Sequence, residues 1–185
     1  MKEFSTKNNF CVFLTQADDL GRVVIPKEIR RTLRIRVGDP LEIYTEKDGE
    51  VIFKKYSPMG ELGDFASEYA AALSKTAGLP AVITDRDSII AACGIPKREI
   101  LERRVSSDLE NLMNERETFR SVEADGGISV AEGVNSCSAG VAVPIISEGD
   151  TIGTVVFILK EKTPTETELK LAEAAAGFLG RHMEG

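Results

Sequence analysis

The first 55 residues have the pattern of a unit that is too small to be stable by itself. Strand patterns occur at 10–14, 22–25, 41–44 and 51–53. A short helix is predicted after Pro26, and Asp48-Gly49 is the signal of a tight hairpin between the last two strands. A unit below about 60 residues buries too little surface on folding, and its strands leave edges that another copy can pair with. The sequence therefore predicts an N-terminal all-β head, residues 1–55, formed as a dimer in which two copies interleave their hairpins into one barrel.

Basic residues gather within this head, although the formal net charge of the chain is −7. The stretch 21–36 contains one acidic residue, Glu28, and six basic residues. These six are Arg22, Lys27, Arg30, Arg31, Arg34 and Arg36. Residues 1–56 carry a net charge of +2, whereas residues 57–185 carry a net charge of −9. Because a polyanion attracts the first part and repels the second, we expect the head alone to approach it.

The local pattern predicts that several of these cations face solvent. The apolar residues 23–25 read as a short buried strand, and Pro26 suits the first position of the helix after it. Ile29 and Leu33 lie four residues apart, which places both on the inward face of that helix. The side chains expected to point away from the core are Arg30, Arg31 and Arg34. A strand and a short helix that display guanidinium groups are suited to phosphate contact.

Residues 56–60 break the strand pattern and separate the head from the rest of the chain. We therefore divide the chain into the head at 1–55, a linker with an amphipathic helix at 56–80, and a body at 81–185. The helix is predicted from apolar residues at intervals of three and four, which form one stripe. The stripe consists of Leu62, Phe65, Ala66, Tyr69, Ala72, Leu73 and Thr76. Such a stripe packs either on its own domain or on a partner helix, as in a bundle.

The body has the mixed pattern of an α+β domain. Strands are predicted at 81–84, 88–92, 119–122, 128–131, 140–146 and 151–159. A charged helical region begins after Pro96, and Ser107-Asp108 is expected to cap a second helix. Residues 165–168 form a capping-box sequence at the start of a last helix. This order of elements predicts an antiparallel sheet with flanking helices.

Cysteine usage and hydropathy argue against a secreted or membrane protein. The three cysteines, Cys11, Cys93 and Cys137, lie far apart and lack CxxC spacing, which argues against a disulfide framework and a zinc site. The apolar runs have the length of strands and are too short to span a bilayer, and none resembles the core of a signal peptide. We therefore expect a cytoplasmic localisation, no membrane partner and no metal site.

Catalytic chemistry has weak support in the sequence. The single histidine, His182, lies in the last predicted helix and reads as a surface residue. Cys93 and Cys137 read as core residues, because neither belongs to a recognisable redox motif. We therefore predict that the protein is not an enzyme, that it has no catalytic residues and that it uses no cofactor.

Residues 18–58 closely resemble the AbrB-like family of transition-state regulators. The matching text is DDLGRVVIPKEIRRTL at 18–33, followed by GDPLEI at 38–43. Further similar text is KKYSP at 54–58, ELGDF at 61–65, DRD at 85–87 and AAGFL at 175–179. The resemblance therefore extends over nearly the whole chain after residue 17, to members of the family that act in spore formation.

This resemblance implies a swapped-hairpin β-barrel dimer for residues 1–55 and a GAF-like regulatory domain after the linker. It also implies a homotetramer for the full-length chain and a role as an activator or a repressor of transcription. The family is associated with AT-rich, loosely defined targets, which fits recognition of DNA shape and flexibility. GAF-like domains often enclose a small-molecule pocket, so an unidentified ligand is a further hypothesis.

The resemblance also narrows the choice of DNA-binding residues. The candidates are Arg22, Arg30, Arg31, Lys27 and Arg34. The first three correspond to the arginines with which the family contacts DNA, and the other two are added from their charge. Related proteins carry a basic pair in the first strand, where this chain has Thr15 and Gln16. We expect this departure to lower the affinity for DNA more than it alters the fold.

The sequence thus favours a transcription regulator that binds double-stranded DNA through a homodimeric head. The alternative is a cytosolic small-molecule sensor or interaction module with weakened DNA binding, which the unusual segment 3–17 motivates. A redox enzyme that uses Cys93 or Cys137 is a third hypothesis.

Overall fold

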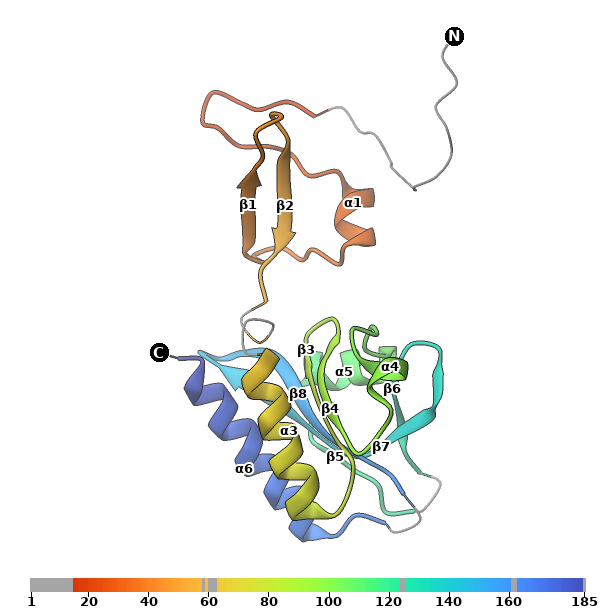
Figure 1. Ribbon diagram of the computed structural model, residues 1–185. Coiled ribbons are helices and arrows are strands. Elements are labelled where there is room, and N and C mark those ends of the chain that lie inside the picture. Colours follow the sequence, from red (N-terminus) through yellow and green to blue (C-terminus); the bar gives the residue numbers. More distant parts are fainter. Residues whose placement is uncertain (1–14, 58, 60–62, 124–125, 161–162, 185) are drawn as a thin grey trace. The chain divides into compact units, whose positions relative to one another are not determined.

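The computed structural model describes residues 15–57, 59, 63–123, 126–160 and 163–184 (Figure 1). The chain divides into two compact units, Met1–Tyr56 and Ser57–Gly185, which are called the head and the body below. The strand predicted at 10–14 and the stripe residue Leu62 lie outside the described residues.

The head contains one hairpin and one short helix. Strands β1 (Leu41–Thr45) and β2 (Val51–Lys55) pair antiparallel from Leu41↔Lys55 to Thr45↔Val51, which confirms the predicted hairpin. Gly49 lies in the turn between them with φ 83°, a conformation that glycine adopts without a steric penalty. Helix α1 spans Lys27–Thr32, and Pro26 is its N-cap, one position before the predicted one.

The prediction of a buried strand at 22–25 is wrong for a single head. Within the described residues this stretch forms only an isolated bridge between Val23 and Ala17, and Val24 is 71% exposed. The physical reason is a lack of neighbours, because no described residue of the head is buried. A strand becomes buried only when another layer covers it.

The body is built on an antiparallel sheet, as predicted (Figure 1). Its strands are β3 (Ala81–Asp85), β4 (Ile89–Cys93), β5 (Phe119–Arg120), β6 (Ile128–Ala131), β7 (Val134–Ser147) and β8 (Asp150–Ile158). The order along the sheet is β4-β3-β8-β7-β5, and β6 also pairs with β7. The two longest strands, β7 and β8, were the strongest strand predictions, although β7 begins earlier than expected.

Helices cover both faces of this sheet. Helices α3 (Gly63–Ala77) and α6 (Glu166–His182) pack over one core, to which β8 contributes Val155 and Phe157. Helices α4 (Lys97–Ile100) and α5 (Ser107–Glu115) belong to a second core, to which β8 contributes Val156 and Ile158. Because successive side chains of a strand point to opposite faces, the apolar run 155–158 of β8 is explained by burial on both sides.

The helix caps agree with the sequence pattern in one case and differ in another. Helix α6 begins with the predicted capping box, in which Glu168 accepts a hydrogen bond from the backbone N–H of Thr165 at 2.7 Å. Helix α5 is capped by Ser106, whose hydroxyl accepts from the N–H of Leu109 at 3.2 Å, and not by Ser107-Asp108. The same hydroxyl donates to the carbonyl of Ser129 at 2.6 Å, so a tertiary contact selects the cap.

The apolar stripe predicted for the helix after the linker is only partly correct. Ala66, Ala70 and Leu73 form the buried face of α3, whereas Ala72 and Thr76 are exposed. Intervals of three and four allow more than one helix face, and contact with β3 and β4 decides between them.

Helix α6 packs directly onto the backbone of β7. A Cβ atom built on Gly180 would overlap the carbonyl oxygen of Ile146, whereas one built on Gly177 meets no atom within 4 Å. Gly180 is therefore required for close approach, and Gly177, three residues earlier in the same helix, is not.

This contrast gives a matched pair of variants. Gly180→Ala is expected to lower the free energy of unfolding of the body by about 1–3 kcal/mol or more, because the backbones of α6 and β7 must separate. Gly177→Ala is expected to raise it by about 0.5–1 kcal/mol, because alanine restricts the unfolded chain and favours the helix. Urea denaturation of the full chain measures both values. Equal effects of the two substitutions would contradict the close contact.

Candidate nucleic-acid interface

Arg22 is held at the surface of the head by a local turn. The carboxylate of Asp18 accepts hydrogen bonds from the backbone N–H groups of Leu20 and Arg22, at 3.0 Å and 2.8 Å. It also pairs with Nε of Arg22 at 2.7 Å, while the side chain of Arg22 stays 74% exposed. The backbone and side-chain hydrogen bonds from Arg22 hold the pKa of Asp18 below its usual value. An exposed ion pair of this kind contributes little stability, so it positions Arg22 without preventing contact with a phosphate.

The end of α1 is a Schellman turn with an arginine where glycine is usual. The N–H of Ile35 donates to the carbonyl of Arg30 at 2.8 Å, and the N–H of Arg34 donates to that of Arg31 at 3.4 Å. Arg34 occupies the left-handed position with φ 51°. A non-glycine residue in this conformation costs about 1–2 kcal/mol. The turn therefore carries a cation at a position where backbone geometry favours glycine.

The structure separates the candidate cations into two groups. Lys27 and Arg31 are exposed like Arg22. Arg30 and Arg34 are half-buried, and the Nε atom of Arg30 and the Nη1 atom of Arg34 are covered by protein. The prediction that Arg30 and Arg34 point away from the core is therefore wrong for a single head.

Leu33 also lies differently from its predicted position. It was expected to face inward with Ile29, but it lies beyond the last residue of α1 and is 51% exposed. The helix ends one residue too early for the spacing of four to place both side chains on one face.

A partly covered ion pair joins the basic segment to the hairpin. The ammonium of Lys55, at the end of β2, lies 3.0 Å from the carboxylate of Asp39 and donates to the carbonyl of Arg34 at 3.0 Å. The same carboxylate accepts from the N–H of Arg36 at 2.9 Å. Burial alone would raise the pKa of Asp39, but the Arg36 N–H and the Lys55 ammonium outweigh it and lower the pKa. The sequence pattern gives no signal for Lys55, because the contact joins residues 16 positions apart.

The neutral residues that replace the basic pair lie beside the same segment. Thr15 donates a hydrogen bond from its hydroxyl to the carbonyl of Val24 at 2.8 Å, and both Thr15 and Gln16 are exposed. The position that is basic in related proteins therefore remains at the surface here, where it supplies hydrogen-bonding groups without charge.

The head also exposes a large amount of apolar surface. Its exposed large hydrophobic side chains are Leu20, Val23, Val24, Leu33, Val37, Ile43, Tyr44, Val51 and Ile52. Exposure reaches 95% at Val37 and 63% at Ile43. Contiguous apolar surface on this scale marks an interaction site in a small soluble unit.

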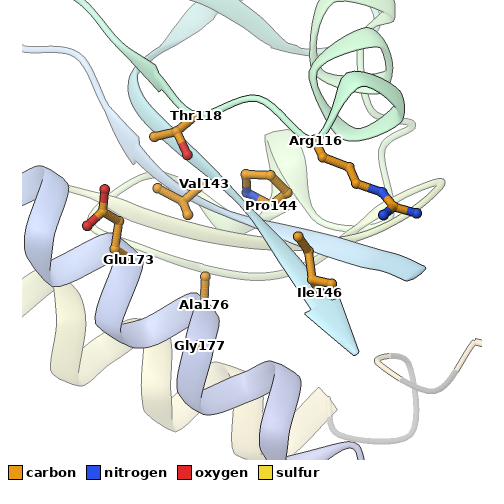
Figure 2. Close-up of a pocket in the computed structure, with 8 residues that line it drawn as sticks. All are labelled: Arg116, Thr118, Val143, Pro144, Ile146, Glu173, Ala176 and Gly177. Carbon is orange, nitrogen blue, oxygen red and sulfur yellow. The ribbon is translucent and has the colours of Figure 1, made fainter. Parts of the chain in front are cut away.

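The body carries a hollow of about 330 Å³ between α6 and the sheet (Figure 2). Residues of β7 and α6 form its apolar part, and Arg116, Thr118 and Glu173 supply the polar groups. Figure 2 shows Glu173 and Arg116 on opposite sides of Pro144. Glu173 also receives a hydrogen bond from the ammonium of Lys170 at 2.8 Å. The hollow is large enough for a small molecule.

An aromatic cluster joins the two long helices of the body. Phe65 of α3 stacks on Tyr69 with ring centroids 5.8 Å apart and on His182 of α6 at 5.1 Å. Phe178 of α6 lies 5.5 Å from Tyr69 and is 49% exposed. Burial raises the pKa of Tyr69. His182 is thus a partly stacked surface residue, in agreement with the interpretation of the sequence.

The described residues contain no group of three His, Cys, Asp or Glu side chains arranged to hold a metal ion. Cys137 is buried in the core beside α5, and Cys93 is half-buried against the other core. Among the helices of the described part, none is both long and apolar enough to cross a membrane.

Comparison with known protein families divides the chain at the same region. Residues 61–184 match the family described as stage V sporulation protein T C-terminal, transcription factor. Residues 14–60 match the family described as antidote-toxin recognition MazE, bacterial antitoxin.

Individual proteins extend this result to almost the full length. The chain is 53% identical to stage V sporulation protein T of Bacillus subtilis (strain 168) over 172 residues, which cover 90% of this chain and 94% of that protein. It is 58% identical to the transition state regulatory protein AbrB of the same organism over 43 residues, which cover 23% of this chain and 44% of that protein.

A solved structure supports the fold of the body. The GAF domain of a phosphoenolpyruvate-protein phosphotransferase from Acinetobacter matches with a TM-score of 0.54 and 10% identity, over 70% of this chain and 84% of that chain. This likeness shows a GAF-like fold with an antiparallel sheet and helices. The family matches show that the head is AbrB-like.

Proposed function

Because the chain belongs to the stage V sporulation protein T family, it is a DNA-binding transcription regulator of sporulation, and we propose that its head contacts the duplex through the basic segment 21–36. The observation that carries this proposal is the set of exposed cations Arg22, Lys27 and Arg31 on an anchored backbone. Arg30 and Arg34 complete the proposed site. Their guanidinium groups are partly covered in a single head, so their contact with DNA depends on how the partner head rearranges this cover.

A dimer of heads is the second part of the proposal. Two copies interleave their hairpins into a swapped barrel that covers the apolar side chains of β1, β2 and the segment 22–25. The support is the exposure of Val24, Ile43 and Val51 and the complete lack of buried residues in the described part of one head. Two-fold symmetry then doubles the basic segment, which suits the two-fold symmetry of duplex DNA.

The proposed mechanism is electrostatic attraction followed by insertion of arginines into the grooves. Lysine and arginine contacts to phosphate set affinity and register, whereas arginine can also form paired hydrogen bonds with base edges. With Thr15 and Gln16 contributing no charge, the segment 21–36 supplies most of the cations of the head. A protein that works in this way on chromosomal DNA acts in the cytoplasm.

The DNA contact is tested by a salt titration of the full chain on an AT-rich duplex. Arg22→Ala with Arg31→Ala is expected to weaken binding and to reduce the slope of log K against log salt by about 0.9 for each phosphate that is no longer neutralised. Lys47→Ala with Lys54→Ala is the matched control, because it removes the same charge from exposed lysines of the same head outside the segment. If the control and the double variant had the same effect, the assignment of the site would be wrong.

The alternative function, a small-molecule sensor with weakened DNA binding, is separated by the same titration. It predicts that the wild-type protein binds duplex DNA weakly and without a steep dependence on salt. The observation that favours it is the neutral pair at Thr15 and Gln16.

We also propose that the aromatic cluster joins two dimers into a tetramer. Phe65 and Tyr69 of α3 lie against Phe178 of α6, and Phe178 remains about half exposed. The occupant is the same face of a second copy, since a two-fold contact places identical aromatic side chains against one another.

Light scattering of the full chain tests the tetramer. Phe178→Glu is expected to halve the molecular mass, because a carboxylate would be buried without a partner at the contact. Phe178→Leu keeps an apolar side chain and is expected to retain the mass. A wild-type dimer, or a tetramer in both variants, would contradict the assignment of this face.

A small-molecule ligand of the body is the last part of the proposal, and the hollow of Figure 2 is the place proposed for it. A thermal-shift screen of metabolites should find a compound that stabilises the wild type by about 2.7 kcal/mol at 100 times its dissociation constant. Gly177→Leu adds a side chain at the lining of the hollow and should reduce the shift, because a Cβ atom on Gly177 meets no atom within 4 Å. Lack of any shift, or an equal shift in the variant, would count against a ligand at this place.

A further inference from the structure

The body, which is acidic as a whole, contains one local concentration of cations. The segment 97–104 holds four basic residues, Lys97, Arg98, Arg103 and Arg104, in a body whose net charge is −9. The same segment holds two acidic residues, Glu99 and Glu102. Four of the 12 basic residues of the body therefore lie within eight positions, and the proposed contact of the head uses none of them.

The backbone of this segment is fixed against the edge of the sheet. The N–H of Glu102 donates to the carbonyl of Ile89 at 2.9 Å, and the N–H of Ile89 donates to the carbonyl of Arg103 at 2.9 Å. These hydrogen bonds place the segment beside β4, with α4 at its start (Figure 1). Ile100 and Val105 are fully buried on either side of residues 101–104. The cations therefore project from an anchored strip.

Three of the four cations are available to a partner. Lys97, Arg98 and Arg103 are exposed, and no ion pair is formed by any of them among the described residues. Arg104 differs, because its carbonyl accepts a hydrogen bond from the N–H of Glu132 at 2.9 Å, which brings an acidic residue close to it.

Some other cations of the body have structural partners. Lys170 pairs with Glu166 and Glu173 within its own helix, at 3.9 Å and 2.8 Å. Arg120 donates to the carbonyl of Pro164 at 3.3 Å. Since Lys97, Arg98 and Arg103 have no such partner in the described part of the chain, their charges remain available for hydrogen bonds to an external anion.

We propose that Lys97, Arg98 and Arg103 form a second phosphate-contacting surface, which binds the sugar-phosphate backbone of the duplex held by the heads. This proposal rests on the proposed DNA contact of the head and adds the body as a second point of attachment. The contact is electrostatic and independent of base sequence.

The net charge of the body does not oppose such a contact. At physiological ionic strength the Debye length is about 8 Å, so acidic groups farther from the phosphates are largely screened. The charge closest to the contact decides its sign, and there the three cations outnumber the acidic residues Glu99 and Glu102 by one, while Arg104 lies beside Glu132. The proposal differs from the sequence-based expectation that the head alone approaches DNA, because it adds local attraction at one strip of the body.

The test uses the full chain with Lys97→Ala, Arg98→Ala and Arg103→Ala combined. Binding to an AT-rich duplex and to a random duplex, each longer than the footprint of the heads, is measured as a function of salt. The expected result is a similar loss of affinity on both duplexes and a slope reduced by about 0.9 for each phosphate that each protomer no longer neutralises. A matched control combines Lys75→Ala, Lys160→Ala and Arg181→Ala, which removes the same charge from exposed positions elsewhere in the body. The control is expected to keep the wild-type slope.

The outcomes separate this proposal from the function of the head. A wild-type slope in the triple variant, or an equal change in the control, overturns the second surface while leaving the head contact intact. Normal binding by Arg22→Ala with Arg31→Ala overturns the head contact instead. The variant Lys97→Arg, Arg98→Lys and Arg103→Lys keeps the charge and is expected to bind like wild type. Weak binding by this charge-conserving variant would overturn the electrostatic contact.

Discussion

A single head buries none of its described residues, and this shortage of covered surface governs the organisation of the chain. Burial of apolar area supplies about 25 cal/mol for each Å², so a unit that leaves Val24, Val37 and Ile43 exposed lacks the main source of stability. What holds the head in shape is polar and local, such as the turn at Asp18 and the pair between Lys55 and Asp39. These contacts orient the basic segment but do not replace a core. The proposed contact with DNA and the proposed dimer of heads therefore depend on the same unit.

The body solves the same problem within one chain. Its sheet is covered on both faces, and the last four residues of β8 alternate between two cores. Close contacts between backbones complete the packing where α6 meets β7 at Gly180. A folded body of this kind provides a stable support for a head that cannot complete its own core. Its surface includes the aromatic cluster and the basic strip at 97–104, for which the tetramer contact and the phosphate contact are proposed.

The net charges of the two units do not show that the basic residues are concentrated in short segments. The head is basic because of one segment, and that segment is bound to its hairpin through the carboxylate of Asp39. The body is acidic, but screening makes distant charges weak in comparison with those at contact distance. A regulator built in this way is repelled from DNA over most of its surface and attracted at few positions, which favours one orientation on the duplex.

Much of the fold could be predicted from the sequence, because its signals are local. The hairpin at Asp48-Gly49, the capping box at Thr165 and the strand patterns of the body each depend on residues a few positions apart, and the structure contains all three. The family motif likewise identified the arginine segment by sequence alone. The predictions that failed concern side-chain cover, as at Leu33, Arg30 and Arg34. Their exposure depends on where the helix ends and on what lies opposite.

Only the tertiary structure decided the features that join distant residues. Ser106 became the cap of α5 because the carbonyl of Ser129 lies within reach of its hydroxyl. Lys55 anchors the basic segment from the far end of the hairpin, and Phe65 meets His182 across two helices. The sequence by itself determined which elements form and which residues carry the charge. The three-dimensional packing decided which of those residues are covered and which meet, because such contacts depend on distances in space that no local pattern contains.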